Sequence, residues 1–279
     1  MRLGYNTNGL QNHRLDEALV LLAEFGYESV ALTLDVMHLD PFRSTVDDVA
    51  RIAELLQDLG LTPVIETGAR FLLDPTAKHE PTLMTRDPEG RALRLEFYRR
   101  AATIGRDLGA EVVSFWAGID RSPDEDSWAW LCEGVGATCR AIRDVGLVPA
   151  LEPEPGMAVA TLTEFGRLQS ALGSDAPDLT LDIGHLYVNE PEPVGDLVER
   201  WGASIRQVHL EDMKRGIHDH LVPGEGDVDF RNDLEALERV GFRGSVCFEL
   251  SRSSHMAPTA LEICRTVWRQ AIVDPSRSP

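Results

Sequence analysis

A short apolar run followed by a longer amphipathic segment recurs along the chain, and this repeat limits the folds that the sequence can adopt. The first unit joins a strand-like run, "RLGYNT" at 2–7, to a helix-like segment, "LDEALVLLAEFG" at 15–26. The second joins "SVALTLD" to "VDDVARIAELLQDLG". About eight such units, each of roughly 35 residues, follow one another. Strands and helices that alternate without a break in composition predict a parallel sheet covered by helices.

The number of units favours a closed barrel over an open sheet. Eight strand–helix units in 279 residues fit a single-domain (β/α)8 TIM barrel, an α/β fold. The alternative is an open, doubly wound sheet, but the usual GxGxxG after the first strand is missing. We therefore predict one barrel domain over 1–271 and a disordered tail over 272–279.

Charge and composition exclude several classes of protein. The formal net charge of −19 repels phosphate backbones, so nucleic acid is not an expected partner. No apolar run approaches the roughly 20 residues that cross a bilayer, and "MRLGYNTNGL" lacks the form of a signal peptide. We expect a cytoplasmic protein without a membrane partner. Its four cysteines, none in a CxxC pair, are expected to be reduced thiols.

Acidic residues and one histidine end four successive predicted strands. Glu152 ends the fifth strand, Asp182 the sixth, His209 the seventh and Glu249 the eighth. In a TIM barrel these ends converge on the active-site face. Three carboxylates and an imidazole suit Mn²⁺, Mg²⁺, Co²⁺ or Zn²⁺, whereas separate caps or surface charges would be the ordinary alternative. The pattern predicts one divalent metal at the mouth of the barrel.

The same segments resemble a known superfamily. The motifs "LEPEPG", "LDIGH", "QVHLED", "HLVPGEGDVDF" and "FEL" lie in the order and spacing of the xylose isomerase-like TIM barrels. That superfamily includes sugar and sugar-phosphate isomerases and epimerases, inosose dehydratases and endonuclease IV. The resemblance implies that Glu152, Asp182, His209 and Glu249 hold one divalent metal.

Three further histidines leave two interpretations open. His185 follows the sixth strand, and His218 and His220 lie in the loop after the seventh. By resemblance to endonuclease IV they could bind a second metal. By resemblance to sugar-processing relatives they would contact a substrate hydroxyl or phosphate, which is the interpretation we favour.

The resemblance implies a sugar isomerase or epimerase that acts through a metal-stabilised enediolate. Glu152 and Glu249 would then remove and return the proton. Trp116, at the end of the fourth strand, could form an apolar wall against the sugar, with ordinary packing inside the barrel as the alternative. A metal-dependent dehydratase of an inosose or polyol, using the same chemistry to expel water, is the alternative. A multi-zinc phosphoesterase like endonuclease IV is less favoured, because no histidine ends the third or fourth strand and the chain is acidic.

Cations in the predicted third loop suggest what the substrate carries. The loop "ETGARFLLDPTAKHEPTLM" contains Arg70 and Lys78, and Lys78 is one of only two lysines in the chain. On the active-site face these cations could anchor a phosphate or carboxylate, although local salt bridges to Glu66, Asp74 or Glu80 would also explain them. We expect a sugar, sugar phosphate or polyol as the partner. A homo-oligomer remains open.

Overall fold

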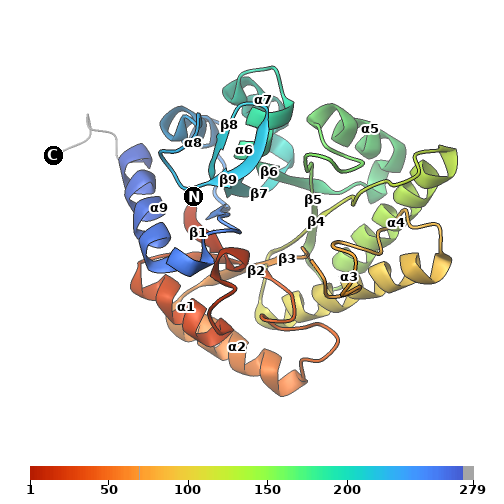
Figure 1. Cartoon of the computed structure of the whole chain (residues 1–279), viewed down its shortest axis with the longest axis horizontal. Helices are drawn as coiled ribbons and strands as arrows, with labels where there is room; N and C mark the ends of the chain where they lie inside the picture. The colour runs from red at the N-terminus through yellow and green to blue at the C-terminus, as the bar shows by residue number, and fades with distance from the viewer. Residues whose placement is uncertain (69, 273–279) are drawn as a thin grey trace.

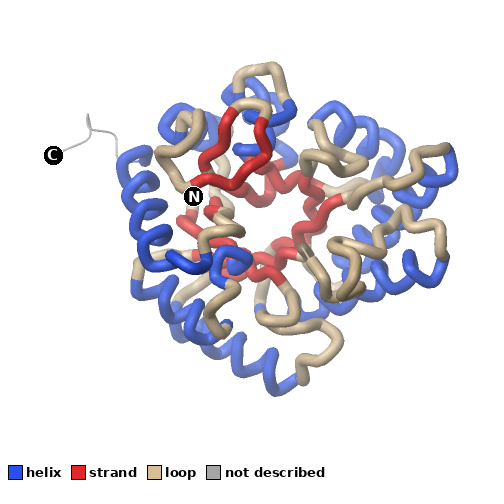
Figure 2. Tube along the Cα trace, in the orientation of Figure 1, coloured by secondary structure: helices blue, strands red, loops and turns tan. Residues whose placement is uncertain are grey.

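A ring of parallel strands enclosed by helices forms the molecule (Figures 1 and 2). The computed structural model describes residues 1–68 and 70–272. The barrel is closed, with strand order β1-β10-β7-β6-β5-β4-β3-β2. Its strands are β1 (Arg2–Asn6), β2 (Ser29–Thr33), β3 (Thr62–Glu66), β4 (Val112–Trp116), β5 (Val148–Glu152), β6 (Asp178–Asp182), β7 (Ile205–Leu210) and β10 (Ser245–Phe248).

Helices connect these strands and cover the outside of the barrel. The connecting helices are α1 (Leu15–Glu24), α2 (Val46–Leu59), α3 (Pro88–Leu108), α4 (Glu125–Asp144), α5 (Leu162–Leu172), α7 (Val194–Trp201), α8 (Phe230–Arg239) and, after the last strand, α9 (Ala257–Ile272). Short 3₁₀ turns lie at Thr7–Leu10, Gly173–Asp175, Gly202–Ser204 and Ser254–Met256. Side-chain caps at Thr45, Asp124 and Thr161 fix where α2, α4 and α5 begin.

The predicted (β/α)8 barrel of one domain is confirmed, and the last strand closes the ring on the first. Arg2 pairs with Ser245 and Tyr5 with Phe248 in a parallel register. Among the described helices, none is long and apolar enough to cross a membrane. The four cysteines are free thiols. The expected tail lies outside the described residues except for Ile272, which ends α9.

Each strand turns alternate side chains outward and inward, and the two sets differ in chemistry. Outward residues such as Leu151 and Phe248 belong to the large apolar core between strands and helices. Inward residues include a small apolar cluster of Val64, Val112 and Ala150, with polar side chains beyond it. Ser114 on β4 meets Thr180 on β6, with 2.9 Å between the hydroxyl oxygens, although these strands are not neighbours in the sheet. Such contacts cross the barrel, so they identify its polar interior.

Two elements near β7 were not predicted. A two-stranded hairpin, β8 (Asp212–Lys214) and β9 (Ile217–Leu221), stands where the sequence suggested a loop, and the short helix α6 (Ile183–Asn189) begins directly after β6. Asp212 accepts backbone hydrogen bonds from Gly224, Gly226 and Val228 and so fixes the loop after the hairpin. Gly184 lets α6 approach β7, because a Cβ there would lie 1.9 Å from a carboxylate oxygen of Glu211.

A fully buried arginine anchors the long connection between β3 and α3, residues 67–87. Arg94 of α3 donates from Nε to the carbonyl of Pro81 (2.7 Å) and from one terminal nitrogen to that of His79 (2.8 Å). Its guanidinium also lies 5.3 Å from the ring centroid of Trp116. His79 has a positive φ of 67°, which residues other than glycine rarely adopt, so the connection needs such support.

Arg94→Met should loosen this connection while leaving the barrel closed. Two buried carbonyls would lose a charged donor, and we expect the free energy of unfolding to fall by about 1–3 kcal/mol. Thermal or denaturant unfolding and limited proteolysis of residues 67–87 would measure the effect. Arg99→Met, an exposed site on the same helix, is the matched control. Equal stability of the two variants would contradict the anchoring role.

Candidate active site

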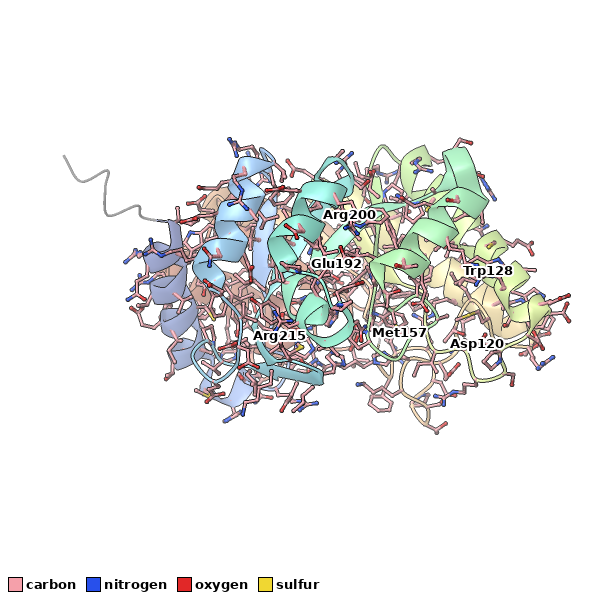
Figure 3. All side chains as sticks on the ribbon, turned by 90° about the horizontal axis from the view of Figure 1, so that it is seen from above. Asp120, Trp128, Met157, Glu192, Arg200 and Arg215 are labelled. Carbon is pink, nitrogen blue, oxygen red and sulfur yellow. The ribbon has the colours of Figure 1, made fainter. Side chains whose placement is uncertain are left out.

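The last inward-facing residues of the eight strands form a ring at the carboxyl end of the barrel. All of them except Trp116 are polar. For β1 to β7 they are, in chain order, Asn6, Thr33, Glu66, Trp116, Glu152, Asp182 and His209, and Glu249 directly follows β10. Figure 3 shows this face edge-on: Asp120, Met157 and Arg215, from the segments after β4, β5 and β7, lie toward one side, and Arg200 at the end of α7 lies toward the other.

A cavity of about 350 Å³ opens above this ring. Six ring residues line it, together with side chains from the loops after β3, β5 and β10 and from the hairpin. Its size suits a small molecule. A larger hollow of about 820 Å³ lies outside the barrel beside α1 and α2, but it contains none of the ring residues. The barrel cavity is therefore the candidate active site.

The four residues predicted as metal ligands come together around Nδ1 of His209. A Glu152 oxygen lies 3.0 Å from this nitrogen, a Glu249 oxygen 3.1 Å and an Asp182 oxygen 4.0 Å. One potential ligand atom from each of the four lies within 4.8 Å of the others. The structure thus places the predicted cluster where the sequence put it, on β5, β6, β7 and just after β10.

The other ring nitrogen of His209 is held by residues that the sequence analysis did not select. Nε2 lies 2.9 Å from a Glu66 oxygen, and the same oxygen accepts a hydrogen bond from the Gln207 amide at 2.6 Å. A carboxylate behind a histidine fixes its tautomer and its orientation toward a ligand. Glu66 ends β3, and the period-two pattern of strand ends could have identified it as an inward residue.

Further hydrogen bonds orient the carboxylates. The Asn8 amide donates to Glu249 at 2.6 Å, and the backbone N–H of His185 donates to Asp182 at 2.8 Å. Asn8 lies in the turn after β1 and was not among the predicted site residues. These bonds leave the other Asp182 oxygen buried without a hydrogen-bond partner among the described residues.

Burial makes so much negative charge unfavourable without a cation. Burial, opposed mainly by His209, raises the pKa of Glu152 to about 8. Burial together with the charges of Glu152 and Glu249 raises the pKa of Glu154 well above its usual value. Burial lowers the pKa of His209, but Glu66, Glu152 and Glu249 outweigh it and raise that pKa well above its ordinary value. The buried carboxylates therefore share too little positive charge, most of it from His209, to be ionised together at low cost.

This donor set fits a divalent cation. Three carboxylates and one imidazole converge, and the Asp182 oxygen without a hydrogen-bond partner in the described part of the chain is free to coordinate a cation. Glu152, Asp182, His209 and Glu249 could hold the ion and leave positions open toward the cavity.

The three additional histidines form a second group beside the first. The ring of His185 lies 4.9 Å from that of His218 and 5.9 Å from that of His220, centroid to centroid. Glu154, which the sequence analysis quoted only within a motif, lies 3.6 Å from Nε2 of His185 and 3.7 Å from Nε2 of His218. This group could bind either a second metal or substrate oxygens, so both interpretations remain.

The predicted wall residues also line the cavity. The ring centroid of Trp116 lies 5.0 Å from that of His79, in an edge-on arrangement. Arg70 and Lys78 lie on the same connection as His79 and also line the cavity. Arg252, after β10, joins them and was not predicted. The alternative that Arg70 and Lys78 form salt bridges to nearby acids is not seen among the described residues, because those acids have other partners. Glu66 contacts His209, Asp74 accepts a hydrogen bond from Thr76, and Glu80 pairs with Arg121.

Comparison with known proteins shows which proteins the chain resembles. L-ribulose 3-epimerase of Mesorhizobium japonicum is 24% identical over 274 residues, which cover 93% of this chain and 83% of that protein. Inosose dehydratase of Lacticaseibacillus casei is 27% identical over 142 residues, 45% of this chain and 47% of that protein. The chain thus matches about half the length of that relative.

A solved structure and a family model agree with this placement. The crystal structure of the IOLI protein with a zinc atom superimposes with a TM-score of 0.77 at 20% identity, covering 98% of both chains, which shows a shared fold. The model of the family described as "Xylose isomerase-like TIM barrel" matches residues 19–269. The chain therefore belongs to the xylose isomerase-like TIM barrel family.

Proposed function

We propose that this protein is a divalent-metal-dependent sugar or sugar-phosphate epimerase or isomerase that moves a proton at a carbon next to a carbonyl. The observation that carries the proposal is that Glu152 and Glu249 approach the same His209 nitrogen from different strands, at 3.0 and 3.1 Å. The match to L-ribulose 3-epimerase over nearly the whole chain supports it.

Glu152, Asp182, His209 and Glu249 would hold the metal. When bound, a divalent cation supplies positive charge against the negative charge that develops on the substrate oxygens as the proton leaves. The zinc atom in the IOLI structure supports a divalent ion here. Glu66 and Gln207 would keep His209 oriented toward it.

Glu152 and Glu249 are the proposed acid and base. Each would exchange a proton with one face of the substrate carbon, so that removal by one and return by the other inverts the configuration. Asn8 holds the Glu249 carboxylate in place with a 2.6 Å hydrogen bond. We assign His218 and His220 to contacts with substrate oxygens and Trp116 to an apolar wall, because all three line the cavity. His185 is assigned with the two histidines because its ring lies 4.9 Å from that of His218 and 5.9 Å from that of His220.

A dehydratase of an inosose or polyol is the second candidate. Loss of water begins with the same proton removal, but the departing hydroxyl also needs a proton donor. Glu154, between His185 and His218, is a side chain that could serve such a step. The match to inosose dehydratases over part of the chain also favours this candidate.

Isotope incorporation separates the two candidates. An epimerase or isomerase working in D₂O should place deuterium on the carbon next to the carbonyl, because the glutamates exchange the removed proton with the solvent before they return one. Apart from this replacement of one hydrogen by deuterium, the product should keep the elemental composition of the substrate. The metal-loaded protein would be incubated with ketopentoses, ketohexoses, their phosphates and inososes, and the products followed by NMR and mass spectrometry. A product lighter by one water would instead establish the dehydratase.

Glu249→Gln should lower turnover by about 10²–10⁴-fold, because the amide keeps the shape of the side chain but cannot take up the proton. Steady-state kinetics would measure the loss, and circular dichroism would show that the fold is kept. Glu225→Gln, at an exposed glutamate, should leave activity unchanged. An active Glu249→Gln variant would remove Glu249 from its assigned role.

Glu66→Gln should weaken metal binding by about 10–100-fold although Glu66 is not a proposed ligand, because His209 would lose the carboxylate that orients it. Chelator competition with the metal-free protein would give both affinity and stoichiometry, with Glu225→Gln as the control. We expect one ion per chain. A second zinc that disappears in a His218→Gln, His220→Gln double variant would show that these histidines form a metal site and would direct attention to phosphate esters.

A further inference from the structure

We infer that Arg70, Lys78 and Arg252 form a subsite for an anionic group, a phosphate or a carboxylate, carried by the substrate. This inference rests on the proposed function, which supplies the sugar part of the substrate. The inference goes beyond that function because such a subsite would favour charged substrates over neutral sugars.

The three cations share one cavity with the catalytic candidates although they come from different parts of the chain. Arg70 and Lys78 lie on the connection after β3, and Arg252 follows β10. The same cavity is lined by Glu152 and Glu249. A single small molecule in this space of about 350 Å³ can therefore reach both the carboxylate cluster and the cations.

The positive charge of this wall is only partly balanced by the protein. Among the residues that the structure describes, no carboxylate lies within 4.0 Å of the Lys78 ammonium, and none forms an ion pair with Arg70. Arg70 donates instead to the neutral side-chain oxygen of Gln11 at 3.0 Å. Arg252 pairs with Asp219. In a chain with a net charge of −19, unpaired cations facing a cavity are not explained by a shortage of acids.

Two groups on this wall are affected both by burial and by neighbouring positive charge. Burial and then the charge of Arg70 lower the pKa of Lys78, and Arg252 lowers it further against the opposing effect of Glu154. Burial followed by the charge of Lys78 lowers the pKa of His79 to about 4, with smaller contributions from Arg94 and Arg70. A bound anion would relieve this repulsion and would gain charge-assisted hydrogen bonds.

Glu154, the acid whose charge acts on Lys78, is turned toward other partners. The two oxygens of Glu154 face His185 at 3.6 Å and His218 at 3.7 Å. Arg94 holds the carbonyls of His79 and Pro81, so the backbone next to Lys78 is anchored beside the cavity. Cations placed there favour a ligand that brings its own negative charge.

The test compares three probes that differ only at one end: glycerol, glycerate and glycerol 3-phosphate. Their dissociation constants would be measured by saturation-transfer NMR on the metal-loaded protein and on Lys78→Met and Lys214→Met variants. Lys214 is the only other lysine, is exposed and lies outside the cavity lining, so it is the matched control. Arg70→Met gives a second variant if Lys78→Met does not fold.

We expect at least one charged probe to bind more tightly than glycerol, and Lys78→Met to weaken that probe by about tenfold or more. Lys214→Met should change nothing. A preference for glycerol 3-phosphate would identify a sugar phosphate, and a preference for glycerate a sugar acid.

Equal binding of the charged probes to the wild-type and Lys78→Met proteins would overturn the subsite. Binding that survives in Lys78→Met but disappears when the metal is removed would also overturn it, because the anion would then sit on the metal. Neither result depends on turnover, so failure of this inference is distinct from failure of the proposed reaction.

Discussion

Negative charge buried at the open end of the barrel is the constraint on which the rest of the site depends. Glu152, Asp182 and Glu249 lie within 4.0 Å of one nitrogen of His209, in a barrel whose outer wall is apolar. Burial opposes ionisation of these carboxylates, so the arrangement is stable only where positive charge is supplied. His209 supplies some, and the open geometry of the donor set leaves room for a cation to supply more. Asn8, Gln207 and Glu66 hold these groups in position.

The fold and the centre of this site could be predicted because both follow from local patterns. Alternation of strand and helix indicates the barrel, and the side chain at the end of each strand must face either the mouth or the outer layer. Glu152, Asp182, His209 and Glu249 each end an apolar run, which makes them visible in sequence. The metal and substrate roles assigned to them stay predictions, since geometry alone gives proximity and not binding.

The missed residues depend on partners far away in the chain. Glu66 matters because Gln207 and His209 approach it across the barrel, from residues more than 140 positions away. Arg252 joins Lys78 in one cavity only after β10 closes against β1. The sequence of α3 shows an arginine among apolar residues, but its function becomes clear only when the carbonyls of His79 and Pro81 lie against it.

The residues proposed for proton transfer and those proposed for substrate selection stand on different parts of the fold. The carboxylate cluster stands on strand ends, whose positions are fixed by hydrogen bonding around a closed barrel. Lys78, Arg70 and the histidines of the hairpin stand on connections outside that ring. In the proposed reaction, proton removal next to a carbonyl uses the ring, whereas the fate of the intermediate depends on the groups above it. Such a division would allow relatives named as epimerases and as dehydratases to share one fold. In this chain those groups include a cationic wall on one side and a Glu154–histidine group on the other, so the identity of the substrate should be sought in the 67–87 connection and the hairpin rather than in the metal cluster.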